Sequence, residues 1–338
     1  MPKREGRYVI GLPNAPAVIS WASAVGKTES EGPLADEFDV CYPTDKICDG
    51  SWEMCESKLS DTALENAFRK CGKSVDDADI LFAGDLLNQC VASTFAARGT
   101  DIPYAGLFGA CSTMALAAAM AALCVDSGAA KLAGACASSH FCSAERQFRF
   151  PLEYGGQRTP TAQRTVTGAG AMLIADSIND LPRITRVMIG RIRDQGITDA
   201  NNMGAAMAPA AACTIIDFLR DTQTSPSDYD LILTGDLGKI GSELLRELMI
   251  TREKTDISRV HNDCGLMIYD LDRQNVYSGG SGCGCSASVV CSHILKKLSR
   301  GELHRVLYVA TGALMSPTTA QQGENIPAIA HAVEICKF

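Results

Sequence analysis

The chain repeats one of its own segments, and this duplication restricts the possible folds more than any other feature of the sequence. Residues 79–86 read DILFAGDL and residues 230–237 read DLILTGDL, so Asp, Gly, Asp and Leu recur at matching positions. Each segment is typical of a buried strand that ends in a Gly-Asp turn and leads into a helix. A duplicated fold places its functional site where the two halves join, so we expect the site near these strand ends.

A second pair of segments follows the repeat in the same order in both halves. In the first half an Ala-rich helix opens at Gly109, and a buried strand is expected over 131–137. In the second half a helix opens at Gly282, and the matching strand is expected over 305–311. Strands that alternate with helices and show no polar alternation predict an α/β fold.

The sequence also indicates where one half ends and the other begins. A last strand of the first half is expected over 167–176, and Pro and polar residues then interrupt the apolar pattern at 180–183. We therefore place an N-terminal half at 1–178 and a C-terminal half at 179–338. The final strand of the second half is expected within 326–335, docked on the sheet.

Composition and charge exclude several classes of protein. Hydrophobic residues make up 46% of the chain and charged residues 21%, which is typical of a compact globular protein and not of a disordered one. Lys and Arg number 31 against 39 Asp and Glu, and the net charge of −8 argues against a nucleic-acid binder and a polybasic membrane anchor. The chain start does not resemble a secretory signal, and the longest apolar candidate, 114–125, is too short to span a membrane.

The 15 Cys residues predict a cytosolic protein with reduced thiols. Their number is odd and they are scattered from Cys41 to Cys336, which is a poor framework for disulfides. Most are expected to be small buried apolar residues. Cys283 and Cys285 are too close together for half of a zinc site, so no metal and no other cofactor is predicted.

The most informative segment surrounds Cys111, in the sequence GLFGACSTMA at residues 106–115. A short apolar strand, a Gly that permits a tight turn and Cys-Ser-Thr at a helix start place the thiol beside unpaired backbone N–H groups. Such a position lowers the pKa of a thiol and favours a nucleophile. The alternative is a packing cysteine within a buried helix.

The sequence resembles the thiolase and ketoacyl synthase superfamily in its duplicated α/β pattern, its Gly-Ala-Cys-Ser elbow and its TGAGAM segment at 167–172. The segments GLFGACSTMALAAAM, SSHFCSAERQFRFPLEYGGQRTPTAQ and HNDCGLMIYD resemble, more closely, the stage V sporulation protein AD family of spore-forming bacteria. This resemblance covers about residues 6 to 315. It implies a thiolase-like, five-layer αβαβα fold with pseudo-twofold-related halves, and a role in the uptake of dipicolinic acid (pyridine-2,6-dicarboxylate) into the developing spore.

Two groups that assist the elbow Cys in the condensing enzymes of this superfamily are absent from the sequence. Those enzymes place a His or Asn after a second-half strand and another in a Gly-rich turn. The resemblance puts these positions at Gly235, beside Asp236, and at Cys283. With both proton-handling groups changed, Claisen condensation is not expected. Cys111 is retained, so acyl loading at its thiol remains an alternative.

A cavity without its catalytic pair suits a binding pocket. Dipicolinate carries two carboxylates on a small aromatic ring, so its site should offer helix N-terminal N–H groups or Arg, together with a flat apolar wall. The predicted ligand-binding residues are Cys111, Ser112, His140, Arg146, Arg149, Arg164, Asp236 and Cys283.

Alternatives stay open for several of these side chains. Arg146, Arg149 and Arg158 would instead pair with acidic residues at a subunit interface. His140 would be a core histidine bound to a backbone carbonyl.

The remaining histidines give weaker indications of function than His140. His261 lies three positions before Cys264 and could be read as part of a nucleophile set, but adjacent residues rarely face one another, so local hydrogen bonds at a strand entry are favoured. His304 and His331 stand among charged or small residues and are expected at the surface.

The leading functional hypothesis is a non-catalytic, dipicolinic acid binding component of the spore's uptake machinery. The resemblance implies a homodimer that works beside the other membrane proteins of the stage V sporulation A operon. It would be attached through them to the cytoplasmic face of the forespore or spore inner membrane. One alternative is an acyl-CoA-dependent acyltransferase that uses Cys111 with help from His140, and another is an interaction scaffold with an empty pocket.

Overall fold

The computed structural model describes residues 1–148, 158–177 and 179–338, and its strands fall into two sets. The strands before residue 178 are β1 (Lys3–Glu5), β2 (Val9–Gly11), β3 (Ala17–Val25), β4 (Val40–Cys41), β5 (Ile80–Gly84), β6 (Tyr104–Gly106), β7 (Leu132–Ser139), β8 (Arg164–Thr165) and β9 (Gly168–Ala175). The strands after it are β10 (Arg183–Met188), β11 (Leu231–Thr234), β12 (His261–Asp263), β13 (Gly280–Ser281), β14 (Arg305–Ala313) and β15 (Ala328–Cys336).

Both sets have the same internal order. From its outer edge the first set runs β6-β5-β7-β9-β3, and the second runs β12-β11-β14-β15-β10. In each set the first three strands are parallel to one another, and the last two are antiparallel to their neighbours. Pairing of Arg183 with Ala17 joins β10 to β3 where the sets meet. The carboxyl ends of β5 and β11 are therefore equivalent places, and ligands of parallel sheets bind at such ends.

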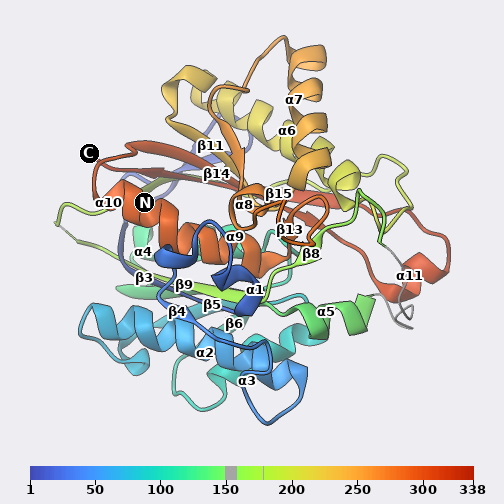
Figure 1. Ribbon diagram of the computed structural model, residues 1–338. Coiled ribbons are helices and arrows are strands. Elements are labelled where there is room, and N and C mark those ends of the chain that lie inside the picture. The colour runs from blue at the N-terminus through green and yellow to red at the C-terminus, as the bar shows by residue number, and fades with distance from the viewer. Residues whose placement is uncertain (149–157, 178) are drawn as a thin grey trace.

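Helices lie on both sides of the strand sets and produce five layers. They are α1 (Lys27–Ser30), α2 (Trp52–Lys70), α3 (Val91–Ala97), α4 (Thr113–Asp126), α5 (Phe141–Phe148), α6 (Met203–Thr222), α7 (Gly238–Glu253), α8 (Cys264–Met267), α9 (Cys283–Val289), α10 (Leu295–Ser299) and α11 (Pro317–Gln321). Figure 1 shows α6 and α7 outside one strand set, α2 and α3 outside the other, and α4, α9 and α10 between them. This arrangement matches the predicted αβαβα architecture.

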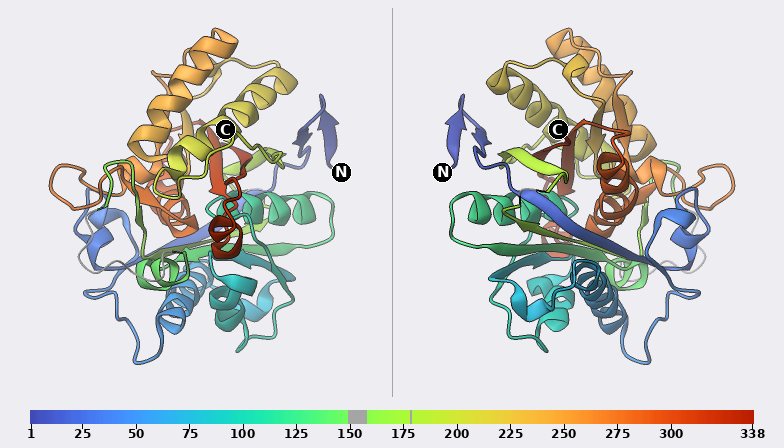
Figure 2. Two further views of the ribbon diagram at one scale, coloured as in Figure 1. Left: turned by 90° about the vertical axis from the view of Figure 1, so that its right-hand side faces the viewer. Right: turned by 90° about the vertical axis from the view of Figure 1, so that its left-hand side faces the viewer.

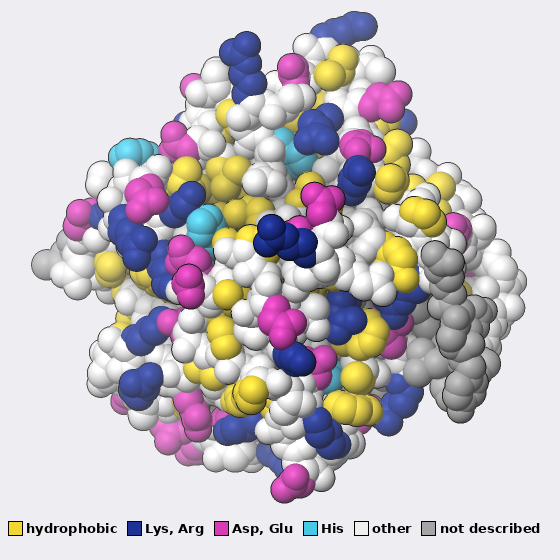
Figure 3. All heavy atoms as spheres, viewed as in Figure 1, with side chains coloured by type: hydrophobic (Ala, Val, Ile, Leu, Met, Phe, Trp, Pro, Cys, Tyr) yellow, Lys and Arg dark blue, Asp and Glu magenta, His cyan; other side chains and the backbone are white. Residues whose placement is uncertain are grey.

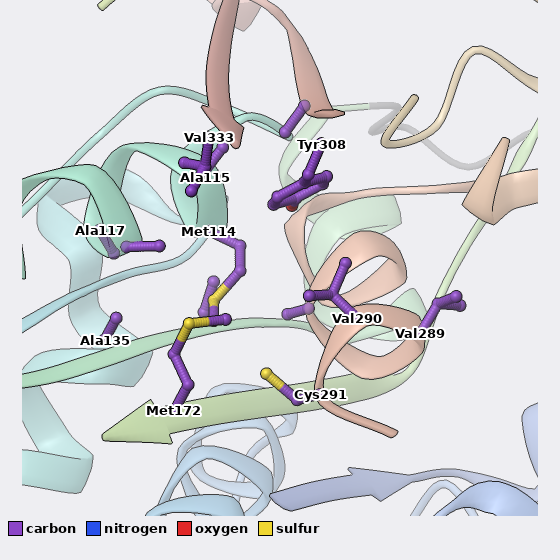
Figure 4. Close-up of a cluster of buried hydrophobic side chains, with 14 of the residues drawn as sticks. Met114, Ala115, Ala117, Ala135, Met172, Val289, Val290, Cys291, Tyr308 and Val333 are labelled. Atoms are coloured by element: carbon purple, nitrogen blue, oxygen red, sulfur yellow. The ribbon is translucent and has the colours of Figure 1, made fainter. Parts of the chain in front are cut away.

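The central layer explains why the Ala-rich segment is apolar on every side. Because α4 lies between two strand sets, it has almost no face toward water, and Met114 and Ala117 are fully buried. In Figure 4 the side chains of Met114 and Met172 point into the same interior space, close to Cys291. The second-half counterpart of α4 is not one regular helix as expected, because a π-helical segment, Val290–Ile294, separates α9 from α10.

The long helix α6 belongs to the core. Within the described residues it is long and apolar enough to cross a membrane by length and composition. This was not expected, because the sequence indicated only 114–125 as a candidate and that segment is too short. Of its most apolar window, 67% is buried inside the protein, where the helix packs against α7, β14 and β15. Core helices pass the same test, so we interpret α6 as a structural element of the outer layer.

Most of the predicted strands are present. The segments expected at 131–137, 167–176, 305–311 and 326–335 correspond to β7, β9, β14 and β15. An N-terminal hairpin of β1 and β2 was not predicted; it projects at one edge in Figure 2, with β2 paired to β10. The division of the chain at residue 178 stays a prediction.

Candidate functional site

The elbow that precedes α4 is a tight and strained turn. Ala110 has a left-handed backbone with φ of 49°, which costs free energy for a residue other than Gly. The Ser112 hydroxyl donates to the Gly109 carbonyl at 2.6 Å, and the Thr113 hydroxyl donates to the Ala110 carbonyl at 2.6 Å. A Cβ atom at Gly109 would lie 2.7 Å from the Ser112 hydroxyl, so only Gly fits there. These contacts hold Cys111 at the start of the helix, as predicted.

Asp236 is the group that meets the Cys111 thiol. It follows β11 and is fully buried, and its carboxylate accepts hydrogen bonds from the Gly282 N–H at 2.9 Å, the Thr311 hydroxyl at 3.0 Å and the Ser281 hydroxyl at 3.2 Å. The Cys111 thiol interacts with the same carboxylate. The two halves of the chain therefore meet at this pair, as the duplication suggested.

The expected partner position, Gly235, lies one residue too early. A Cβ atom on Gly235 would lie 3.1 Å from the Cα of Ala310, because this residue packs directly on β14. The backbone has no space there for an imidazole or amide. The side chain that points to the thiol is that of the next residue, Asp236.

Cys111 and Asp236 both hold their protons to a higher pH than such groups usually do. Burial, and then the charge of Asp236, raise the pKa of the Cys111 thiol well above its ordinary value. Burial raises the pKa of Asp236 to about 6, although its hydrogen bonds oppose the shift. At neutral pH the Cys111 sulfur is therefore a thiol and a hydrogen-bond donor, not a nucleophilic thiolate.

Cys283 closes the other side of the site. It is fully buried at the start of α9, and its thiol donates to the Ser138 carbonyl at 2.8 Å. Burial, and then the nearby Cys111, raise the pKa of the Cys283 thiol well above its usual range. This residue therefore offers neither an imidazole nor an amide to a reacting group.

A small cavity adjoins Cys111 and opens toward α5. Its volume of about 40 Å³ is enough for a few water molecules but not for an aromatic ring. The residues that line it are Leu86, Phe108, Ala110, Cys111, Ala144, Glu145, Phe148, Thr165, Met203, Ser281, Ala313 and Met315. Most of these side chains are apolar, and no His, Lys or Arg among the described residues is part of the lining.

Of the predicted ligand-binding residues, Cys111 lines this cavity, and Asp236 and Cys283 stand behind it. Ser112 is fully buried, and its hydroxyl is used within the elbow. Arg149 lies outside the described residues.

His140 has the structural role that was left open as an alternative. Its Nδ1 accepts from the Cys142 N–H at 3.1 Å, so Nε2 carries the proton and donates to the Asp45 carbonyl at 2.9 Å. Its ring lies against Trp52, with 5.5 Å between the centroids. Burial lowers the pKa of His140, so the ring is neutral and both nitrogens are occupied. It is not placed to act as a base for Cys111.

The arginines of this region have partners of their own. Arg146 forms an ion pair with Glu53, and Arg158 lies 2.9 Å from Glu145. The Arg164 guanidinium stacks on Phe141 at 4.0 Å from the ring centroid. Arg158 is linked to the cavity through its partner Glu145, which lines it.

His331 is a residue of this site that the sequence did not indicate. It was expected at the surface, but β15 is an interior strand, and His331 is buried directly behind the elbow. Its Nδ1 accepts from the Gly190 N–H at 3.1 Å, and a Cβ atom at Gly109 would lie 3.6 Å from its Nε2. Burial lowers its pKa to about 4, so the ring is neutral. The apolar run around it, AIAHAVEI, was the available signal for burial.

The cluster at His261 bonds to the neighbouring strand β11 and the turn after it, so its hydrogen bonds are less local than the sequence favoured. His261 Nε2 lies 3.0 Å from the Thr234 hydroxyl, and Asp263 accepts from the Leu237 and Gly238 N–H groups at 2.8 and 3.0 Å. Asp263 thus fixes the turn that carries Asp236. Across the described residues, no group of three or more His, Cys, Asp or Glu side chains is arranged to hold a metal ion.

Comparison with known proteins shows close similarity to a single family. The family model of Stage V sporulation protein AD (SpoVAD) matches residues 6–336. Stage V sporulation protein AD of Bacillus subtilis (strain 168) is 49% identical to this chain over 316 residues, which are 94% of this chain and 93% of that protein.

Solved structures of other proteins share the fold. 3-Oxoacyl-[acyl-carrier-protein] synthase III from Aquifex aeolicus VF5 is similar over 95% of this chain and 99% of its own, with a TM-score of 0.58 and 12% identity. Cerulenin-bound OleA from Xanthomonas campestris is similar over 98% of this chain and 97% of its own, with a TM-score of 0.59 and 14% identity. At such low identity this likeness concerns the fold alone, and it confirms the predicted thiolase-like α/β architecture.

Proposed function

The chain belongs to the Stage V sporulation protein AD (SpoVAD) family, and on this premise we propose that it binds dipicolinic acid in the cavity beside Cys111 and does not act as an enzyme. Its biological setting is sporulation. In that setting we assign it the part of the dipicolinate-binding component of an uptake system whose membrane proteins are separate chains.

The contact between Cys111 and Asp236 carries the non-catalytic part of this proposal. A nucleophilic thiol needs a neighbouring base or a positive charge. The Cys111 thiol is instead buried and faces a buried carboxylate, which disfavours the thiolate. His140 has both ring nitrogens bonded elsewhere, and His331, directly behind the elbow, is neutral with its Nδ1 bonded to the Gly190 N–H. The fold thus retains a pocket without the means to activate its thiol.

The cavity offers groups that suit a small aromatic dicarboxylate. Phe108 and Phe148 can form apolar walls for a ring, while the Thr165 hydroxyl can donate to a carboxylate. Arg158 pairs with Glu145 at the edge of the cavity, so an entering carboxylate would compete with Glu145 for the guanidinium.

Binding requires the cavity to open. A volume of about 40 Å³ does not admit the ring until side chains move. Met203 and Met315 line the cavity and have flexible, unbranched side chains that can adopt other rotamers. We therefore expect ligand binding to displace these two residues and Phe148.

One observation favours a second candidate, acyl transfer at Cys111. The thiol lies in a left-handed elbow at the start of α4 and borders the cavity, as a nucleophile would. A covalent adduct on Cys111 after incubation with acyl-CoA, seen by intact-mass spectrometry, would support it. Absence of an adduct across acyl-CoAs of several chain lengths would leave the binding function as the better account.

We further propose that the protein is a homodimer joined to the membrane through protein partners. β6 is the edge strand of the first set, and Phe108 close behind it is 50% exposed, which suits pairing with a second copy. On the face drawn in Figure 3, Lys and Arg side chains are interspersed with Asp and Glu. Direct adhesion to anionic lipid needs a clustered basic surface, so attachment through a partner chain is the better fit to a net charge of −8.

Calorimetric titration with dipicolinic acid tests the proposed binding. Saturable heat with dipicolinate, and none with phthalate, is expected. Met203→Trp fills the cavity and should weaken binding at least tenfold. Met54→Trp is the matched control, because Met54 lines a different cavity near α2 and α3 and its variant should bind normally.

Two results would overturn the proposal. No heat with dipicolinate, in a sample whose circular dichroism shows a folded protein, would exclude binding. Equal loss of affinity in the Met203 and Met54 variants would place the ligand elsewhere.

A further inference from the structure

A second cavity lies on the outer side of α6, away from the Cys111 site. It has a volume of about 340 Å³ and is formed by α6, by the segment that follows β10 and by the end of α7. It is lined by Arg193, Gln195, Pro209, Ala212, Cys213, Ile216, Asp217, Arg220, Arg252 and Glu253. The Cys111 cavity touches only Met203 of α6, and Cys213 stands ten residues further on, roughly 15 Å along the helix axis.

Two arginines hold the sulfur atom of Cys213. The Arg193 guanidinium donates to Sγ from Nη2 at 2.8 Å and from Nε at 3.2 Å, and Arg191 Nη2 donates to it at 3.1 Å. An arginine fork normally grips a carboxylate or phosphate in this two-pronged way. Here a sulfur atom occupies the position of the anion.

Two arginines and one acid surround the Cys213 sulfur. Asp217 is the nearest acid and accepts from the Cys213 thiol at 3.5 Å, and it is shared by Arg191 and Arg220, which compensate its charge. Arg193 has no carboxylate within ion-pair distance in residues 1–148, 158–177 and 179–338. Its guanidinium therefore contacts the sulfur without a competing carboxylate of its own, and nearby cations are the usual cause of a reactive cysteine.

The cavity in front of this sulfur is suited to a small anion. Arg220 and Arg252 face it in addition to Arg193, while Asp217 and Glu253 are the acids of its lining. Its volume is within the range of small-molecule sites. Cys213 itself is partly exposed, so a reagent in the cavity can reach it.

We propose that Cys213 is a modification site whose sulfur exchanges with small disulfides bearing carboxylate groups. The thiol gives its proton to water, the sulfur attacks one sulfur of the disulfide, a new S–S bond joins protein and reagent, and the old S–S bond breaks with its electron pair on the departing thiolate. No external oxidant is needed, because the disulfide is itself reduced. The arginines hold the carboxylates of the reagent before attack and stabilise the leaving thiolate.

The test compares an anionic with a neutral disulfide. The protein is treated with 5,5′-dithiobis(2-nitrobenzoate), which carries two carboxylates, or with 4,4′-dithiodipyridine, which carries none, and the released chromophore is followed at pH 7. All variants carry Cys48→Ser, because the sulfur atoms of Cys48 and Cys55 are 3.0 Å apart and would otherwise form their own disulfide after the first attack. Peptide mass spectrometry identifies the modified residue.

We expect a fast phase of one thiol per chain, located at Cys213. Cys213→Ser should abolish this phase, while Cys41→Ser, which removes an exposed thiol, should leave it intact. Arg193→Gln should slow the reaction with the anionic reagent about tenfold, which is the change that one pKa unit of interaction energy produces. It should slow the reaction with the neutral reagent clearly less. Arg300→Gln is the control for a distant exposed arginine and should change neither rate.

Either of two outcomes would overturn the proposal. A fast phase that persists in the Cys213→Ser protein would place the reactive thiol elsewhere. Equal slowing of both reagents by Arg193→Gln would show that the arginine affects the thiol without selecting an anionic partner.

Discussion

Asp85 and Asp236 stand at equivalent ends of β5 and β11, but only Asp236 reaches the Cys111 thiol. Asp85 accepts hydrogen bonds from the Leu87 N–H at 2.9 Å and from the N–H and hydroxyl of Ser93, each at 2.8 Å, and so fixes its own turn. Asp236 fixes the turn at Gly282 and in addition faces the thiol of the other half. A repeated aspartate has thus acquired a second contact in one of its two copies.

The first prediction concerns the reactivity of Cys111. At pH 7.5 iodoacetamide should label this thiol slowly, because its raised pKa leaves little thiolate. Asp236→Asn removes the neighbouring negative charge, lowers the thiol pKa and should speed labelling by about tenfold. Peptide mass spectrometry measures the rate at Cys111. Asp85→Asn is the matched control and should leave the rate unchanged; rapid labelling of the unmodified protein would contradict the prediction.

The second prediction is that Glu29 makes stability fall as pH rises. Glu29 is fully buried, accepts from the Tyr269 hydroxyl and the Thr167 N–H, and burial raises its pKa to about 7 from 4.5. The folded state therefore holds a proton that the unfolded state has released. This contribution is complete below pH 4.5 and is lost as pH rises through 7, and we expect it to be about 3 kcal/mol.

Urea unfolding of a Glu29→Gln variant at pH 5.5 and pH 8 measures this contribution. Gln keeps both acceptor contacts without a titrating group, so the variant should lose less stability between the two pH values. Glu31→Gln, in an exposed residue that follows the same helix, should behave like the unmodified protein. An unchanged pH dependence in Glu29→Gln would contradict the prediction.

The third prediction is that Glu334 makes stability fall as pH falls, which is the opposite of the effect of Glu29. Burial alone would raise its pKa, but donors from Thr185 at 2.6 Å, Arg186 at 2.7 Å and Arg305 at 2.8 Å hold the pKa of this carboxyl below its usual value. Its stabilising contribution is present above pH 4.5 and is lost as pH falls. Glu334→Gln leaves two partly buried guanidiniums without their common anion and should cost about 3 to 5 kcal/mol at pH 7.

Denaturant unfolding at pH 7 and pH 4 checks this expectation. The difference between Glu334→Gln and the unmodified protein should shrink at the lower pH. Glu302→Gln removes an exposed partner of Arg300 and should change stability by less than about 1 kcal/mol. A loss of similar size in both variants would show that the buried network around Glu334 is not specially stabilising.

The fourth prediction concerns the proposed dimer. Phe108→Asp places a charge close to the β6 edge and should convert a dimer into a monomer at micromolar concentration, as measured by sedimentation equilibrium. Ile192→Asp is the matched control, because Ile192 is 61% exposed and lies in the segment after β10, far from β6 in the strand order. A monomer in the unmodified protein, or dissociation caused equally by both changes, would refute the assignment of this edge.

The fold could be predicted largely because its strands are apolar runs with distinct ends. β7 and β14 are mainly apolar segments that follow Gly-containing turns, and the elbow at Cys111 lies between a Gly and a helix start. The π-helical segment at Val290–Ile294 has no such signal, since its side chains are as apolar as those of a regular helix.

The site could be predicted less well because its partners come from distant parts of the chain. The role of His140 is decided by the Asp45 carbonyl, 95 positions away, and the burial of His331 by the strands on both sides of β15. The choice between Gly235 and Asp236 depends on a one-residue difference in where β11 ends. Periodicity and motifs do not contain that information.

The pairing of β3 with β9 has a consequence for synthesis of the chain. β3 lies at residues 17–25 and pairs along almost its whole length with β9 at residues 168–175. A ribosome adds about 5 to 20 residues per second, so β3 waits on the order of ten seconds or more before its partner strand exists. During that interval an apolar strand has an open hydrogen-bonding edge, and folding of the first half in the cell depends on keeping that edge from pairing with other nascent chains.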